Sequence, residues 1–298
     1  MSLGPMQNYS VYPAVFDGLT INHMLSLGFT TNIQKLIAMA GGSVDPALIA
    51  EVARENEIRM STGDIGTVLG SVSPTNGLAV TSTGEIQYQR RKSGGVFSTL
   101  AEHVTLNSTK GILIPRTISS SQDSQEGAAL EISYIPLRVG SNAPFVANVG
   151  QNLTGAPQVN SLYKQGPIIF ENNYLADIQD SMTDFGITFE HWRGSGDIAA
   201  ADGSITKREP KMEFTGRNLE LLNVIGGGLV GMTNGITQYY RAVGFGDGTN
   251  NHIAISFSAG VYEVTDVSGQ KENSVDQKVT VTGTGTISVT VGAAIPTS

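Results

Sequence analysis

Two stretches of this chain resemble each other: IRMSTGDIGTVLG at residues 58–70 and KMEFTGRNLELLNVIG at residues 211–226. Each continues through a Thr-Asn-Gly turn to a Gln-Tyr segment, EIQYQRR at 85–91 and ITQYYRA at 236–242. The matched landmarks keep their order, 151 to 158 residues apart: Met60, Thr62, Gly63, Asn76, Gly77, Gln87, Tyr88 and Arg90 against Met212, Thr215, Gly216, Asn234, Gly235, Gln238, Tyr239 and Arg241. A period near half the chain predicts two related domains, because solenoid repeats are only roughly 20–50 residues long. The alternative is a chance match between two Gly/Thr-rich β segments.

The composition favours an all-β chain that takes part in an assembly. The 298 residues are enough for one large or two medium domains. Charged residues make up 15%, well below the roughly 25% of an average soluble protein. Glycine is frequent, at 36 residues, and cysteine is absent, which excludes disulfides and thiolate metal sites.

The charge balance argues against a general nucleic-acid coat. The net charge is −8 and the pI about 5.0, whereas such coats need clustered Lys and Arg. The N-terminus has no basic region followed by an apolar one, so we expect no secretory signal. The longest apolar stretch, 221–232, contains three consecutive glycines and is too short to span a bilayer. We therefore expect a soluble protein with no membrane segment.

Local patterns predict a mainly β chain with one short helix. Asp45 can cap a helix over Asp45–Asn56, with Pro46 at its favoured first position. Alternating apolar and polar residues predict many strands, and Lys278–Val291 reads as a hairpin that turns at Gly283 and Gly285.

A shift in composition at 140–160 places a domain boundary there. We expect a first β domain at 1–155 and a related second one at 156–298. The alternative is a separate immunoglobulin-like region at 250–298. The polar segment Ser119–Gly127 has no periodic pattern, which predicts an exposed loop.

Patterns that carry catalysis or bind cofactors are missing from the sequence. None of the four histidines has a second one at helical or strand spacing, and no nucleophile elbow, dinucleotide loop or phosphate loop is present. We expect a protein that is not an enzyme and that has no cofactor and no metal.

The chain resembles the major tail protein, or tail tube protein, family of tailed phages. The residues that carry the resemblance are Met-Ser-Thr-Gly at 60–63, Met-Glu-Phe-Thr-Gly at 212–216, the polar loop 119–127 before the strand 126–134, and the Thr/Gly/Val-rich C-terminus. The resemblance implies a β-sandwich with one flanking helix, whose subunits close into rings around a β-barrel lumen. The rings stack into a tube through which DNA passes without specific binding. The protein would then belong to the virion, assembled in the host cytoplasm, with itself and other tail proteins as partners.

Two consequences follow if the family's architecture applies. Where single-domain members form six-fold rings, a duplicated chain needs three copies for a pseudo-six-fold ring. The candidate assembly residues are Ser119, Gln122, Asp123, Gln125 and Glu126, expected to reach a neighbouring ring, and Gln87, Tyr88, Gln238 and Tyr239, expected in the inner wall or core. Two other readings remain open: a head-decoration, spike or baseplate protein, and a carbohydrate-binding or adhesin β-sandwich.

Overall fold

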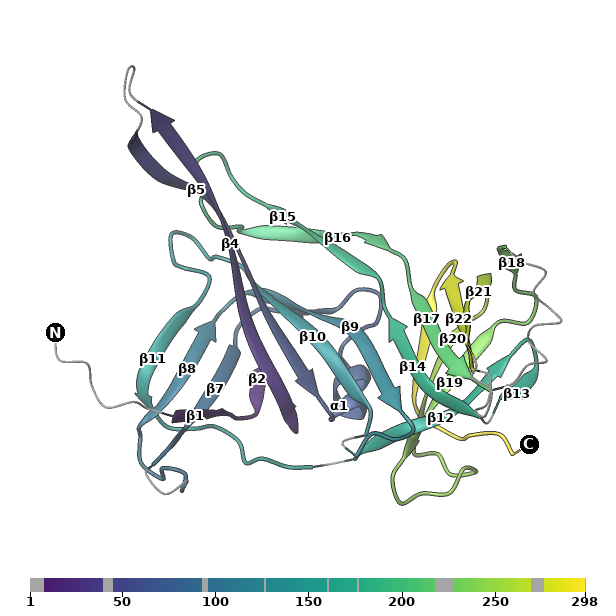
Figure 1. The fold of residues 1–298 in the computed structure, drawn as a ribbon. Helices are drawn as coiled ribbons and strands as arrows, with labels where there is room; N and C mark the ends of the chain where they lie inside the picture. The colour runs from purple at the N-terminus through teal and green to yellow at the C-terminus, as the bar shows by residue number, and fades with distance from the viewer. Residues whose placement is uncertain are drawn as a thin grey trace.

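The computed structural model describes residues 8–39, 45–92, 96–125, 127–159, 161–175, 177–217, 228–268 and 276–297. These residues form a nearly all-β structure of several antiparallel sheets (Figure 1). A helix, α1 (Ile65–Ser71), packs its apolar side into the core with Ile65, Val68 and Leu69. The sequence also predicts a strand at 219–225 and a turn at 93–95, and both lie outside the described residues.

A long central sheet runs through the whole molecule. Its spatial order is β18 (Val230–Gly231), β21 (Gly260–Ser268), β22 (Asp276–Gly283), β17 (Lys211–Gly216), β14 (Ile178–Asp184), β9 (Gly111–Ser121), β10 (Ala129–Pro136), β5 (Pro46–Thr62) and β4 (Met24–Met39), with β6 (Leu78–Val80) also beside β9.

Two smaller sheets accompany the central one. The first outer sheet has the order β11 (Val146–Gln151), β8 (His103–Ser108), β7 (Gly84–Arg91), β2 (Ala14–Phe16) and β3 (Leu19–Ile21), with β1 (Asn8–Val11) also paired to β7. The second outer sheet has the order β13 (Asn173–Leu175), β12 (Tyr163–Phe170), β19 (Ile236–Ala242), β20 (His252–Phe257) and β23 (Ile287–Ala293). A separate hairpin joins β15 (Ile187–Trp192) to β16 (Asp202–Arg208).

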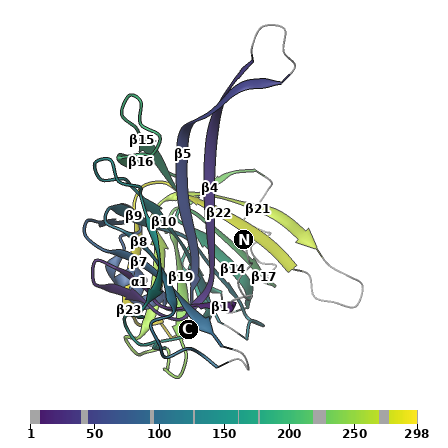
Figure 2. The ribbon, with the colours of Figure 1, turned by 90° about the vertical axis from the view of Figure 1, so that its left-hand side faces the viewer.

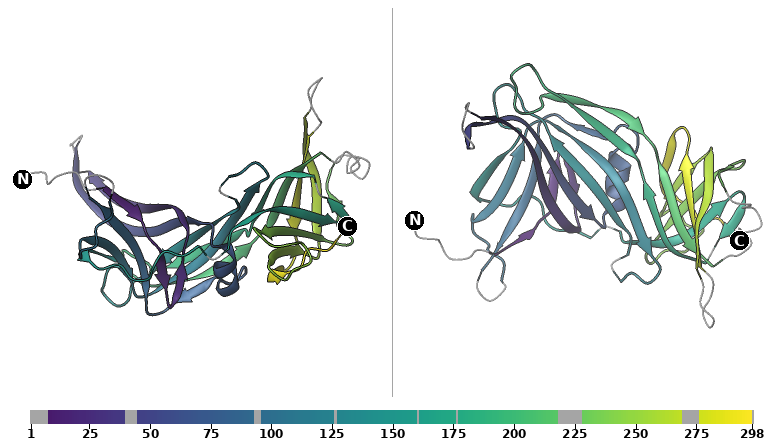
Figure 3. Two further views of the ribbon diagram at one scale, coloured as in Figure 1. Left: turned by 90° about the horizontal axis from the view of Figure 1, so that it is seen from below. Right: turned by 45° about the horizontal axis from the view of Figure 1, so that its top comes forward.

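The core lies between the central sheet and the outer sheets. Strands of the central sheet alternate buried and more exposed residues, as Met60 and Thr62 do around Ser61 in β5. Aromatic side chains join the layers: the Phe16 ring lies 4.7 Å from that of Tyr134, and the Phe170 ring 4.8 Å from that of Tyr262. Figure 3 shows the early strands at one end of the molecule and the late strands at the other, with β9 and β14 between them.

The strand pairings occur twice along the chain. We call residues 8–151 the first repeat and 163–293 the second. Each strand of the first repeat has an equivalent in the second. β1 and β2 together are equivalent to β12, and the other equivalent strands are β3 and β13, β4 and β14, β5 and β17, β6 and β18, β7 and β19, β8 and β20, β9 and β21, β10 and β22, and β11 and β23. In both repeats these strands pair with corresponding neighbours.

Irregular details repeat as well as the pairings. The register shifts after Met24↔Thr62 in one repeat and after Ile178↔Gly216 in the other. A bulge falls at Gly150 in β11 and at Gly292 in β23, both with positive φ.

Polar side chains at equivalent positions also repeat their contacts. The Nδ1 atom of His103 accepts a hydrogen bond from the Arg90 amide at 3.1 Å, and that of His252 accepts one from the Ala242 amide at 3.0 Å. The division at residue 155 stays a prediction, and these shared details are the argument for it.

The registers correct the alignment read from the sequence. They align Met60 with Phe214, Tyr88 with Tyr240 and Ala79 with Gly231. Most sequence landmarks were therefore matched one or two residues out of step, and Asn76 and Gly77 were matched six residues out of step. The strands of 250–298 pair with β17 and β19 of the second repeat, which argues against a separate C-terminal region.

Two predicted elements are wrong. Residues 45–56 do not form a helix: from Pro46 they belong to β5 and pair with β4 as far as Met39↔Pro46, so hydrogen bonds from a partner strand override a good helix signal. Residues 278–291 do not form a hairpin either. β22 pairs with β17 and β21, while β23 pairs with β20, so the chain crosses between sheets near Gly285.

Candidate assembly edges

The central sheet is continuous because the two repeats join edge to edge. β9 of the first repeat pairs antiparallel with β14 of the second, from Asp180↔Ser121 to Asp184↔Thr117. Within this junction Ile118 lies opposite Thr183, and both side chains are fully buried.

A buried polar network lies under this junction. The Ser181 hydroxyl donates to Gln165 Oε1 at 2.6 Å and accepts from Gln238 Nε2 at 2.6 Å. The Ser120 hydroxyl lies 3.0 Å from that of Ser181 and also donates to Gln165 Oε1. Ser120 belongs to the first repeat and the other three to the second, so the network depends on the register of the junction.

The two ends of the central sheet are open in the described part of the chain. β4 is paired on one side only, by β5, and β21 is paired on its outer side only by the two residues of β18. Because β4 corresponds to β14 and β21 to β9, the open edges are the two halves of the internal junction. A row of unpaired backbone groups on such an edge is ready to accept another strand.

The internal register can be transferred to the open edges. It places Gly28 opposite Ser268, Phe29 opposite Val267 and Thr30 opposite Asp266. Phe29 is 44% exposed and Val267 46% exposed, although their equivalents at the internal junction are fully buried. A pairing between copies in this register would therefore place two partly exposed apolar side chains opposite each other, beside the Phe145 ring that lies 5.1 Å from the Phe29 ring within the chain.

The face of the central sheet turned away from the outer sheets is polar. Its acidic residues outnumber its basic ones: Glu57, Glu131, Asp180, Asp184, Glu213, Glu263 and Asp266 against Arg59, Arg116, Lys211 and Lys278. Serines and threonines fill most other positions, and shallow hollows extend across this face.

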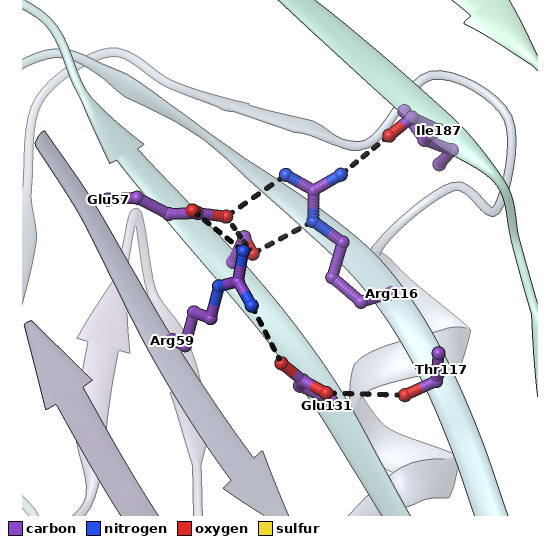
Figure 4. A network of polar contacts seen from close by, with 7 residues as sticks. Glu57, Arg59, Arg116, Thr117, Glu131 and Ile187 are labelled. Atoms are coloured by element: carbon purple, nitrogen blue, oxygen red, sulfur yellow. Dashed lines mark hydrogen bonds and ion pairs between the residues drawn. The ribbon is translucent and has the colours of Figure 1, made fainter. Parts of the chain in front are cut away.

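Ion pairs hold the basic groups of this face against the acids (Figure 4). Glu57 Oε1 lies 3.1 Å from Arg116 Nη2, and Glu57 Oε2 lies 3.2 Å from Arg59 Nη2. Partial burial would raise the pKa of Glu57, but the Ser133 hydroxyl and the two guanidinium groups hold that pKa below its ordinary value. Lys278 Nζ similarly lies 2.6 Å from Glu213 Oε2. The face therefore keeps an excess of negative charge.

The structure divides the loop predicted at Ser119–Gly127. Ser119 lies within β9, opposite Met182 of the second repeat. Gln122, Asp123 and Gln125 are exposed in the turn that follows, and the Gln122 amide donates to the Gln179 carbonyl at 2.7 Å. Glu126 lies outside the described residues. A contact of this loop with another ring stays a prediction.

The two Gln-Tyr pairs belong to the outer sheets, on β7 and β19, rather than to the central sheet. Gln87 is fully buried and bonds to Pro13 and Thr154 backbone atoms, which fastens the end of the first repeat. Gln238 belongs to the junction network, Tyr239 is buried, and Tyr88 is half-buried. All four residues lie in or near the core beneath the outer sheets, and a role for them in ring assembly stays a prediction.

Sequence reasoning missed Phe29 and Val267. Neither belongs to a motif of the sequence. The sequence carries information about these two residues only through the offset of 154 residues that aligns β4 with β14. That offset can be recognised only from the strand pairing in the structure.

The described residues contain no cluster of three or more His, Asp or Glu side chains that could hold a metal ion. None of their helices has the length and apolar character needed to cross a membrane. Comparison of the chain with protein-family models gave no match, and comparison with curated proteins gave none.

Proposed function

We propose that copies of this chain join head to tail through β4 and β21, close into a ring, and stack as rings into the tube of a phage tail. The observation that carries the proposal is the internal junction, which joins the equivalents of these two edges within one chain. Repeating the same contact between chains extends the central sheet in one direction. Such a heterologous contact gives a closed ring if the rotation closes, and closure removes the open edges.

The number of copies in the ring follows from the duplication. Each chain supplies two equivalent units, so three copies give a ring of six units. This count depends on the resemblance to six-fold tube proteins and is part of the proposal.

The polar face of the central sheet is the proposed lumen wall. The opposite face packs against the outer sheets, so ring closure leaves the polar face lining one side of the barrel. An acidic, Ser/Thr-rich wall offers no clustered cations to bind phosphates, which suits a conduit that passes DNA without holding it.

Cysteine cross-linking tests the junction directly, because the chain has no cysteine of its own. Facing residues of antiparallel strands lie about 4.5–5.5 Å apart, within the range that a disulfide spans. We expect the double variant Phe29→Cys with Val267→Cys to form covalent multimers on mild oxidation. The matched control joins Phe29→Cys to Val291→Cys, an exposed residue on an edge strand of the second outer sheet, and should stay monomeric on a denaturing gel.

The single variants separate a head-to-tail contact from a symmetric one. Each single-cysteine chain alone should form few dimers, whereas an equal mixture of the two should form dimers efficiently. Negative-stain electron microscopy of the purified protein should show rings or hollow tubes of uniform bore. Monomers at every concentration, with no more cross-linking than in the control pair, would overturn the proposal.

A further inference from the structure

We infer that a projecting hairpin of the first repeat is a second interaction surface, which docks over the second repeat of the preceding copy. The preceding copy is the one whose β21 pairs with β4, so the inference rests on the proposed head-to-tail ring. We call residues 30–39 and 45–57, the outer part of strands β4 and β5, the arm, and residues 184–211, which carry β15 and β16, the strap.

The arm and the strap are the same hairpin in the two repeats. They have equal length, and the offset of 154 residues matches their registers throughout. Ile33↔Arg54 corresponds to Ile187↔Arg208, and each hairpin then shifts register at the same step. Beyond the shift, Ile37↔Ile49 corresponds to His191↔Gly203.

The two hairpins differ in where they lie. The arm continues straight from the central sheet and projects from the molecule (Figure 2). The strap bends away from β14 at Gly186, which has a positive φ of 60°, and crosses toward β5 of the first repeat (Figure 1). Its tip reaches the arm, where the Arg54 amide donates to the Ile198 carbonyl at 2.8 Å.

Polar groups of the first repeat fasten the strap. Arg116 Nη1 donates to the Ile187 carbonyl at 2.5 Å, and Lys110 Nζ donates to the Ala201 carbonyl at 2.8 Å. The Arg138 amide donates to the Ala200 carbonyl at 2.9 Å. Three basic residues of the first repeat therefore receive the strap.

One face of the strap is covered by these contacts. Along β15 the more covered residues are Ile187, Phe189 and His191, with Arg193 beyond the strand, while Thr188, Glu190 and Trp192 are exposed. Burial lowers the pKa of His191, as expected for a side chain on the covered face.

The corresponding face of the arm is apolar and exposed. The equivalents of the covered strap residues are Ile33, Lys35, Ile37 and Met39, with Ile49 across the hairpin from Ile37. All four apolar members of this set are more than 40% exposed. The equivalent face of the strap is covered, so we expect another surface to cover this exposed apolar face of the arm.

The surface that would receive the arm is matched to it in polarity. The equivalents of Lys110, Arg116 and Arg138 in the second repeat are Ala259, Thr265 and Gly285. The polar strap thus meets basic residues, and the apolar arm would meet a site from which those charges have been removed. This match selects the second repeat of another copy as the occupant.

The tip of the arm gives a specific contact. At the tip of the strap Ala199 forms a β-bridge with Arg54. With the offset of 154 residues, Asp45 is the equivalent of Ala199 and Arg208 is the equivalent of Arg54. The equivalent contact between copies would therefore join Asp45 of one copy to Arg208 of the preceding copy. Each strap would touch the base of an arm and each arm the base of a strap, so the hairpins form a continuous belt around the ring.

Cross-linking at the tip tests the belt separately from the ring. The pair Asp45→Cys with Arg208→Cys should give covalent multimers on oxidation, and the pair Asp45→Cys with Val291→Cys should not. If the Phe29–Val267 pair cross-links and the Asp45–Arg208 pair does not, the belt is wrong and the ring stands. If neither pair cross-links and no rings are seen, the proposed function itself fails.

A pair of arm variants tests the face. Ile37 and Leu36 are 55% and 54% exposed on opposite faces of the arm, so neither change should unfold the chain. We expect Ile37→Glu to raise the concentration for half-assembly at least tenfold and Leu36→Glu to change it less than threefold, measured by mass photometry. Equal effects of the two variants would overturn the assigned docking face.

Discussion

The internal junction and the two open edges are formed by equivalent strands of the two repeats, but the side chains beside them differ in polarity. Inside the chain the junction covers a polar network of Ser181, Gln165 and Gln238. The equivalents of these residues at the β4 edge are Leu27, Val11 and Ile86.

The difference separates two ways to fix a register. A buried polar network is satisfied in one alignment only, so a slip of one residue leaves hydroxyl and amide groups without partners. Apolar edges such as Phe29 and Val267 tolerate water while the chain is alone and gain free energy when they are covered. The chain thus specifies its internal contact by hydrogen bonds and would make its external one by apolar burial.

The sharpest way to break this comparison is to place a charge at equivalent positions of the two junctions. Ile118→Asp puts a carboxylate in the fully buried internal junction and should cost at least about 4 kcal/mol, enough to unfold the chain or make it insoluble. Val267→Asp should leave the melting curve of the free chain nearly unchanged and abolish ring formation. Circular dichroism melts and size-exclusion chromatography measure both. Rings formed by Val267→Asp would contradict the equivalence.

The polar network can be broken by itself. Gln165→Leu removes the acceptor shared by the Ser120 and Ser181 hydroxyls, and we expect a loss of about 2–3 kcal/mol of unfolding free energy. Urea denaturation measures the loss. Gln122→Leu, at an exposed glutamine of the turn next to the junction, is the control and should change the unfolding free energy by less than about 0.5 kcal/mol. Similar losses in the two variants would show that the network does not stabilise the junction.

The bend of the strap is the next feature to test. A side chain at Gly186 would be strained by the positive φ and would meet the Glu209 carbonyl, so Gly186→Ala should cost about 1–2 kcal/mol. Hydrogen exchange should rise within 187–208 and stay unchanged in β9 and β10. Gly70→Ala, with open space around it in α1, should be neutral or slightly stabilising. Unchanged exchange in the strap would mean that the bend does not depend on this glycine.

The smallest expected effect compares two equivalent turns. Burial would raise the pKa of Asp17, but hydrogen bonds from the Thr81, Ser82 and Thr83 amides and from the Ser82 hydroxyl hold that pKa well below its ordinary value. Glu171 at the equivalent turn accepts from two amides, those of Thr233 and Asn234.

Because the folded pKa of Asp17 is lowered, its stabilisation is complete above about pH 4 and is lost as the pH falls toward the folded pKa. Asp17→Asn should therefore cost about 1 kcal/mol at pH 7, after allowance for solvent screening, and the difference from the unchanged chain should shrink below pH 4. Urea denaturation at pH 7 and pH 3 measures it. A difference that is the same at both pH values would exclude the carboxylate as its source.

The sequence predicted the class of structure because that class depends on local signals. Alternation of apolar and polar residues at 129–137 predicts the strand that is β10, and the turn residues at 107–111 mark the end of β8 and the start of β9, although these two strands belong to different sheets. The helix at Asp45–Asn56 failed because local propensity cannot reveal a partner strand. The sequence did not point to Phe29 and Val267 for a related reason: they lie on the edge strands of the central sheet, and the edges are defined by pairings such as Asp180↔Ser121 that no local pattern reveals.

The linker between β11 and β12 has a kinetic consequence for the proposed ring. In the proposed ring, junctions within a chain alternate with junctions between chains, and this linker connects the two halves of each junction within a chain. Those junctions therefore form at an effective concentration set by a short tether rather than by the protein concentration in solution. A six-unit ring then needs two encounters between molecules instead of five, with the last contact closing within the assembled species in both cases. Its formation rate should depend on a lower power of protein concentration than that of a ring built from single units, which would favour closure while the protein is still scarce.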